Sequence, residues 1–269
     1  AALKDAGDNW LSIGGESWNK VKQREFMQAK DSAAAANFEC TAANDEQFSL
    51  AQFSLNGKSE DMRKKMLADK YVLGRIAILG QITAIYAKPN SGKTLLTIYL
   101  LIEAIKSGEL DGSSVFYINA DDTYKGLVYK TELAERYGFQ MIAPGLQDFD
   151  SNLFLRYLQK MIEGDTASGV VVILDTLKKF TDIMDKRVAS DFGKVMRAFA
   201  QAGGTLIMLA HTNKNRDTDG KVVFSGTSDI VDDADCAYTL DVKESAGDLC
   251  TVIFENIKQR GDVVREAAY

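Results

Sequence analysis

The chain has 269 residues, 46% of them hydrophobic, which is enough for one large domain or for one domain with an appendage. Its formal net charge of −6 excludes a globally basic surface for nucleic acid, so any such contact must come from local loops. A single histidine excludes a histidine cluster around a metal, and three cysteines without metal-ligand spacing suit reduced thiols. Because no signal-peptide pattern or apolar run of membrane-spanning length is visible, we expect a cytoplasmic protein without a membrane partner.

The N-terminal part differs in pattern from the rest of the chain. Residues 17–38 have a helical composition but only a weak apolar stripe, which suits either a peripheral helix or an arm that docks on a neighbouring subunit. An Asn-Gly turn signal at 56–57 separates this part from the remainder of the sequence. We therefore expect an N-terminal helical arm or linker at 1–57 and one larger domain at 58–269.

From Tyr71 onward, short apolar runs alternate with helical patterns. Such alternation predicts an α/β fold with a mainly parallel central sheet that helices cover on both faces. The predicted strands lie at 76–86, 115–118, 169–174, 205–210, 237–242 and 249–256. The predicted helices lie at 95–105, 125–137, 151–163 and 190–202.

The segment from Ile82 to Ile105 has the strand, loop and helix that a phosphate-binding P-loop requires. Its loop departs from the pattern G-x-x-x-x-G-K-[ST] only at the first position, which is alanine. Gly92 lets backbone N–H groups approach a phosphate, Lys93 would reach the β- and γ-phosphates, and the Thr94 hydroxyl would ligate Mg²⁺. The alternative is a lysine-bearing turn between a core strand and a helix. The pattern predicts ATP and Mg²⁺ as cofactors, bound by Ala87, Lys88, Pro89, Asn90, Ser91, Gly92, Lys93 and Thr94.

An acidic residue follows the apolar run at 170–174. Asp175 ends this run, so its carboxylate would lie at the carboxyl edge of the sheet beside the P-loop. There it would hold the Mg²⁺ shell together with Thr94, as a Walker B aspartate does. Apolar runs that end in aspartate are common, and the shared sheet with Lys93 is what favours the metal site.

Two adjacent carboxylates close the strand at 115–118. Asp121 is our candidate for the group that orients the attacking water during hydrolysis of the γ-phosphate. The alternative is that Asp121 or Asp122 caps the helix that follows. The residue types leave open which of the two would be the base.

Polar and basic residues follow the later strands. His211 ends the strand at 205–210 and suits either a γ-phosphate sensor or an ordinary histidine at a strand end. The loops at 178–190 and 212–228 carry lysines and arginines that could bind a phosphate backbone, although the residues alone favour ordinary solvated charge. Lys258 and Arg260 follow the last predicted strand, where an arginine can act on a neighbour's nucleotide or simply sit in a surface hairpin.

Taken together, these segments resemble the RecA-like ATPases, and among them the hexameric replicative helicases of the DnaB and plasmid RepA type and their AAA-like relatives. The resemblance covers residues 71–265 and not the first 55 or so. It rests on segments 87–94, 119–122, 174–176, 211–214, 225–228, 232–235 and 258–260.

The resemblance implies a RecA-like P-loop NTPase sandwich with a small N-terminal helical appendage. Asp121 takes the place of the family's water-activating glutamate, and His211 matches the polar switch position. The two basic loops match the loops that contact single-stranded DNA, while Lys258 and Arg260 match the pair that reaches a neighbour's γ-phosphate. The implied function is ATP hydrolysis by an oligomer, with a hexamer favoured, that acts as a DNA helicase or translocase in replication. The alternative is a nucleotide-dependent assembly or regulatory ATPase that does not move DNA.

Overall fold

The computed structural model of the chain describes residues 12–13, 16–17, 49–66, 70–182, 184–216, 222–224, 229–246 and 249–269. The chain divides into two units, at 1–65 and 66–269. The first unit contains β1 (Ser12–Ile13), β2 (Glu16–Ser17), the 3₁₀ helix η2 (Leu50–Phe53) and most of α2 (Ser59–Met66). The helix predicted at 17–38 lies almost wholly outside the described residues, and the domain division at 57 and 58 stays a prediction.

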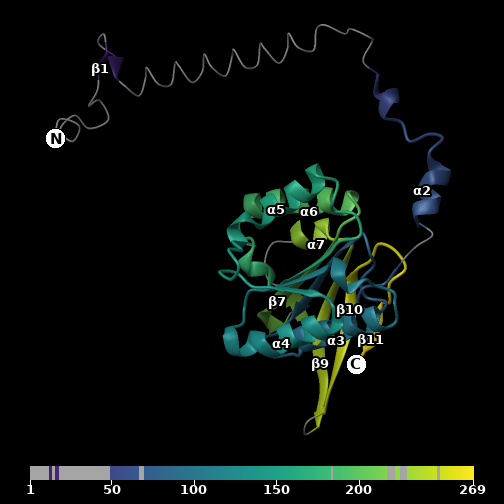
Figure 1. Cartoon of the computed structure of the whole chain (residues 1–269), viewed down its shortest axis with the longest axis vertical. Coiled ribbons are helices and arrows are strands. Elements are labelled where there is room, and N and C mark those ends of the chain that lie inside the picture. Colours follow the sequence, from purple (N-terminus) through teal and green to yellow (C-terminus); the bar gives the residue numbers. More distant parts are fainter. Residues whose placement is uncertain are drawn as a thin grey trace. The chain divides into compact units, whose positions relative to one another are not determined.

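The second unit is built on one sheet, in which nine strands are described (Figure 1). Their order is β11-β10-β9-β3-β7-β6-β4-β5, and β8 pairs with β7. Five neighbouring pairs, from β9 through β5, are parallel, whereas β8, β10 and β11 pair antiparallel. The strands are β3 (Ile82–Ala87), β4 (Val115–Asn119), β5 (Gln140–Ile142), β6 (Val171–Asp175), β7 (Thr205–Arg216), β8 (Val222–Phe224), β9 (Cys236–Ala246), β10 (Leu249–Lys258) and β11 (Glu266–Ala268).

Helices cover both faces of the sheet, as the sequence predicts. In Figure 1, α3 and α4 lie on one face and α5, α6 and α7 on the other. The helices are α3 (Lys93–Lys106), α4 (Tyr124–Tyr137), α5 (Phe154–Glu163), α6 (Lys186–Gln201) and α7 (Asp229–Asp233), with 3₁₀ turns η3 (Gly112–Ser114), η4 (Ser151–Leu153) and η5 (Leu177–Lys179). The fold is a RecA-like α/β P-loop sandwich, which confirms the predicted fold class.

The central strand β3 explains why the sheet needs both layers. Its alternate residues Ile82, Ala84 and Tyr86 enter the core under α5 and α6, while Ile85 and Ala87 enter the core under α3 and α4. Every residue of the strand is buried. A strand buried on both faces reads as a continuous apolar run rather than as an alternating one.

Two basic loops predicted as DNA contacts are more ordered than the sequence suggests. The predicted loop at 178–190 contains part of η5, and α6 already begins at Lys186. Asp185 caps that helix by accepting the backbone N–H groups of Arg187 and Val188 at 2.8 and 3.1 Å. In the predicted loop at 212–228, β7 continues to Arg216 and β8 pairs back with it. The sequence pattern did not predict this β7–β8 ribbon, because its residues at 212–216 are polar and a two-stranded extension beyond the sheet needs no apolar face.

A buried carboxylate anchors the amino end of β3. Asp235 accepts the backbone N–H of Ile82 at 3.0 Å through Oδ2, and its own N–H donates to the Ile82 carbonyl at 2.8 Å. Its Oδ1 accepts from Arg197 of α6 at 2.8 Å, and Arg260 lies 3.6 Å away. Asp235 therefore ties the first residue of the P-loop strand to a helix and to the segment after β10.

Replacing Asp235 with alanine should lower the free energy of unfolding by about 3 kcal/mol, because the Ile82 amide and the Arg197 guanidinium lose a buried acceptor. Asp262→Ala is the matched control, since Asp262 accepts from Arg75 at the same 2.8 Å with both side chains exposed. That variant should cost far less, because solvent screens an exposed ion pair. Urea denaturation measures both losses, and equal values would show that Asp235 anchors nothing.

Candidate functional site

The P-loop of the second unit joins β3 to α3. Gly92 adopts a left-handed conformation with φ 79° immediately before α3, which is a backbone shape that glycine adopts without steric cost. As the N-cap residue, Gly92 offers no side-chain hydrogen bond to the first N–H groups of α3. The hydroxyl of Ser91 is buried and has no hydrogen-bond partner among the described residues. Uncapped N–H groups and a buried, unpaired hydroxyl at a helix N-terminus fit an anion such as a phosphate.

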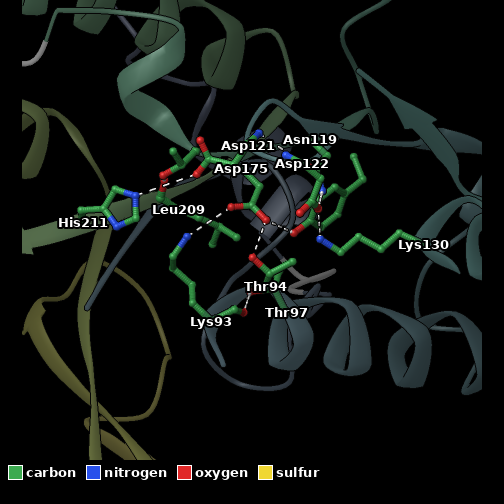
Figure 2. A network of polar contacts seen from close by, with 12 residues as sticks. Lys93, Thr94, Thr97, Asn119, Asp121, Asp122, Lys130, Asp175, Leu209 and His211 are labelled. Carbon is green, nitrogen blue, oxygen red and sulfur yellow. Dashed lines mark hydrogen bonds and ion pairs between the residues drawn. The ribbon is translucent and has the colours of Figure 1, made fainter. Parts of the chain in front are cut away.

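Asp175 is the centre of the polar network at this end of the sheet (Figure 2). The Lys93 ammonium lies 3.2 Å from its Oδ1, and the Thr94 hydroxyl donates to its Oδ2 at 2.6 Å. The buried hydroxyl of Tyr117, on β4, donates to the same Oδ2 at 2.8 Å. Burial and the neighbouring Asp175 charge raise the pKa of the Tyr117 hydroxyl well above its ordinary value, so Tyr117 stays a donor. Lys93 and Asp175 are only 7% and 3% exposed, so each charge depends on the other.

The register of the sheet brings these groups together. Asn119 lies opposite Asp175, which in turn lies opposite Leu209, and Ala87 lies opposite His211. The carboxyl ends of β4, β6 and β3 therefore meet at one edge, beside the part of β7 from Leu209 to His211. This is the edge at which ligands bind in open parallel sheets.

The two adjacent aspartates after β4 occupy different environments. Asp122 accepts from Asn119 at 2.6 Å and forms an ion pair with Lys130 of α4. Burial opposes ionisation of Asp122, but the hydrogen bonds from Lys130 and Asn119 hold the pKa of its carboxyl below the ordinary value. Asp121 is partly exposed, and its Oδ2 lies 3.9 Å from Nε2 of His211. Thr123, rather than either aspartate, stands at the N-cap position of α4.

A cavity of about 440 Å³ opens over this network. It brings together the predicted residues Asp121, Asp175 and His211 with the P-loop from Lys88 to Thr94, whereas Ala87 is buried at the end of β3. Sequence reasoning missed Lys130 and Tyr117, because no spacing signal connects them to the P-loop. The remaining lining residues are Leu95, Ile98, Asn119, Asp122, Tyr129, Lys130 and Leu133.

Lys258 and Arg260 lie away from this cavity. The end of β10 pairs with the beginning of β9, since Lys258 lies opposite Ala237, and β9 runs parallel to β3. Both basic residues are therefore at the amino edge of the sheet, and the P-loop is at the carboxyl edge. Lys258 donates to the carbonyls of Val231 and Asp232 in α7, whereas Arg260 is 55% exposed. Neither side chain reaches the phosphate site of its own chain.

The predicted metal site has a sparse set of ligands. The described residues contain no group of three or more His, Cys, Asp or Glu side chains placed around a metal. The hydroxyl of Thr94 and the carboxylate of Asp175 supply two neighbouring oxygens. This pair fits Mg²⁺, which is commonly held by one or two protein oxygens together with phosphates and water.

A family of AAA domains, AAA_25, matches residues 61–217 of the chain, which is more than half of its length. The chain belongs to this AAA-domain family. Among solved structures, a KaiC-like protein from the hyperthermophilic archaeon Pyrococcus horikoshii OT3 is similar to it with 13% identity and a TM-score of 0.49. The match covers 72% of this chain and 85% of that one. The comparison with curated proteins found no match.

The matched region of the AAA domain includes the P-loop, both aspartates after β4, Asp175 and His211. It ends before Lys258 and Arg260. The family assignment thus rests on the part of the chain that forms the cavity.

None of the helices in the described part of the chain combines the length and the hydropathy that a bilayer crossing requires.

His211 is held close to two positive charges. Burial, and then repulsion by Lys93 and Lys178, lower the pKa of its imidazole, and attraction to Asp121 and Asp175 offsets this only in part. Its Nδ1 is buried and has no hydrogen-bond partner among the described residues. The imidazole is therefore neutral at neutral pH, which lets it accept or donate a single hydrogen bond at each nitrogen.

NMR titration should give His211 a pKa below the ordinary value of about 6.5. Because the chain has one histidine, its imidazole resonances report this residue alone. Asp121→Asn should lower the pKa further, and Lys178→Gln should raise it. Since the unfolded chain binds this proton more readily, folding stability should rise as the pH rises from the folded-state pKa to about 6.5. A midpoint at or above the ordinary value, or shifts of the same sign in both variants, would contradict this account.

Proposed function

We propose that this AAA domain binds Mg-ATP in the cavity, hydrolyses it, and works as an oligomeric motor on single-stranded DNA. The observation that carries the nucleotide site is the convergence of Lys93 and Thr94 on the buried carboxylate of Asp175. A lysine in an ordinary turn would extend into solvent, because a buried ammonium costs free energy unless it is paired. Family membership supports the same coarse function, an ATPase with a P-loop.

In this proposal the P-loop residues exchange partners when nucleotide binds. Lys93 leaves Asp175 for the β- and γ-phosphates, and the N–H groups at the start of α3 bind phosphate oxygens. Thr94 and Asp175 would hold Mg²⁺, which neutralises phosphate charge when it is bound. Water attacks the γ-phosphorus, the bond to the bridging β–γ oxygen breaks, and ADP leaves with that oxygen.

Asp121 orients the attacking water and accepts its proton in this mechanism. Its carboxylate lines the cavity and lies near His211. Asp122 is less suited to this role, because Lys130 and Asn119 already bind its carboxylate and lower its basicity. His211 senses the γ-phosphate through its position between Asp121 and the Lys93 charge.

DNA binding is supported by the position of the two basic segments. One follows β6 with the exposed Lys178 and Lys179, and the other is the β7–β8 ribbon with Lys214 and Arg216. Both begin at the carboxyl edge of the sheet, so a change at the nucleotide can reach them. Phosphate contacts by such segments would give salt-dependent binding without sequence specificity.

An ATPase assay with and without single-stranded DNA tests this function. The oligomer should hydrolyse ATP faster with DNA, and Lys93→Ala should abolish tight Mg-ATP binding, because Lys93 supplies the charge that phosphates require. Since this variant leaves Asp175 buried without its cation, circular dichroism must show that it is folded. Isothermal titration measures the affinity, and unchanged binding by Lys93→Ala would refute the site. An ATPase rate that DNA does not change, with no unwinding of a forked duplex, would instead support an assembly or regulatory ATPase. The sequence pI of about 5.0 favours this alternative.

Oligomerisation is supported by the separation of Arg260 from the cavity. The cavity contains the cations Lys88, Lys93 and Lys130. Arg260, which is exposed at the opposite edge, can serve a neighbouring subunit in a head-to-tail ring or filament, with a hexamer favoured. A guanidinium fork suits developing phosphate charge better than an ammonium does. Lys258, by contrast, already donates to two carbonyls of α7.

Arg260→Ala should leave ATP affinity nearly intact and lower the ATPase rate of the oligomer by about 10³, the lower end for such fingers. Arg265 is another exposed arginine of the same segment, so Arg265→Ala is the control and should keep the parent's ATPase rate.

Asp121→Asn should bind ATP and fail to hydrolyse it, because the base acts only in the transition state. Mixing Arg260→Ala with Asp121→Asn subunits should restore activity at shared sites. Confirmed mixed oligomers without any recovery would place Arg260 outside the neighbour's site.

A further inference from the structure

The carboxylate of Asp175 accepts hydrogen bonds from three described side chains that belong to two different elements. Lys93 and Thr94 come from the first turn of α3, at 3.2 Å from Oδ1 and 2.6 Å from Oδ2. Tyr117 comes from β4, and its hydroxyl donates to Oδ2 at 2.8 Å. Tyr117 is fully buried, in the core under α3 and α4. The tyrosine therefore holds the carboxylate from the body of the sheet, whereas the other two donors belong to the nucleotide-binding loop and helix.

The strand register explains why a tyrosine is required at this position. Tyr117 lies opposite Ile173 on β6, whereas Asp175 lies opposite Asn119. The hydroxyl thus spans an offset of two residues along neighbouring strands, which is roughly 7 Å. Serine or threonine would be too short to cover this offset, and phenylalanine would fill the same space without a donor.

We propose that Tyr117 is a positioning residue that fixes the Asp175 carboxylate for the metal ion of the bound nucleotide. The inference rests on the proposed function, in which Lys93 turns to the phosphates and Thr94 to the metal ion. Both of their hydrogen bonds to Asp175 are then given up. Tyr117 has no such second role, so its hydrogen bond remains and keeps Oδ1 and Oδ2 in a defined orientation. Hydrogen bonds to metal-binding carboxylates commonly set metal affinity in this way.

A purely structural role for Tyr117 makes a different prediction. A buried hydroxyl needs a partner, and Asp175 would satisfy it whether or not a metal ion binds. Loss of the hydroxyl would then change stability alone. A positioning role changes the dependence of nucleotide binding on the metal ion, and it does so before any hydrolysis takes place.

The test titrates Mg²⁺ into the full chain with a fluorescent, non-hydrolysable ATP analogue, starting from EDTA. Tyr117→Phe should raise the Mg²⁺ concentration for half-saturation about 10-fold and leave the affinity in EDTA unchanged. Tyr238→Phe is the matched control, because Tyr238 is also fully buried and donates at 2.7 Å to the Val264 carbonyl, away from the site. That variant should lose similar stability and keep the parent's Mg²⁺ dependence.

Two further variants test the positioning role of Tyr117 if Tyr117→Phe folds poorly. Replacing Tyr117 with p-aminophenylalanine restores a donor and should restore the parent's Mg²⁺ dependence. In an Asp175→Asn background, Tyr117→Phe should have no further effect on half-saturation, since it acts through that carboxylate. Equal half-saturation in Tyr117→Phe and Tyr238→Phe would overturn the positioning role alone. Failure of the parent chain to bind the analogue at any Mg²⁺ concentration would overturn the proposed function and this inference together.

Discussion

The ion pair between Lys93 and Asp175 is the constraint on which the nucleotide-binding edge depends. β7 lies between the strands that lead to these two residues, so their ends are about 10 Å apart. A long side chain at the start of α3 closes this distance to 3.2 Å. Neither charge can remain buried alone, because an unpaired buried ion costs several kcal/mol. The strand order, the tight loop and the start of α3 are therefore matched to one another.

The ion pair between Lys93 and Asp175 also prepares the site for an anion. In the structure, the carboxylate of Asp175 accepts hydrogen bonds from the ammonium of Lys93 and the hydroxyl of Thr94. In the proposed function, a phosphate would take the place of Asp175 beside Lys93, and Mg²⁺ would take the place of Lys93 beside Asp175. The exchange keeps every charge compensated, so the loop needs no large rearrangement to accept the ligand.

The local parts of this site were predictable from the sequence, because the residues of a P-loop motif are consecutive. The strand before Gly92, the helix after Lys93 and the aspartate after 170–174 all follow from short-range patterns. The order of strands does not, since it depends on pairing between distant segments. No signal pointed to Lys130 or Tyr117 either, because neither has a diagnostic spacing: Lys130 pairs with Asp122 eight residues earlier, and Tyr117 reaches Asp175 across a two-residue offset between strands.

Asp121 and Asp122 illustrate the limit of residue types. The sequence presents two equal carboxylates, and only the folding of α4 gives one of them, Asp122, a lysine partner in Lys130. Similarly, polar residues at 212–216 resemble a loop until β8 is seen to pair with β7. In both cases the deciding partner lies some residues away along the chain and has no periodicity of its own.

The carboxylate of Asp235 has one consequence for the oligomer that we propose. Oδ2 holds the first residue of β3, while Oδ1 has two guanidinium neighbours, Arg197 at 2.8 Å and Arg260 at 3.6 Å. Arg260 can therefore be drawn outward by an external anion while Arg197 continues to neutralise Asp235. Such redundancy insulates the strand beneath the P-loop from the movement of the exposed arginine. A neighbour could engage and release this residue repeatedly without loosening the sheet that carries it.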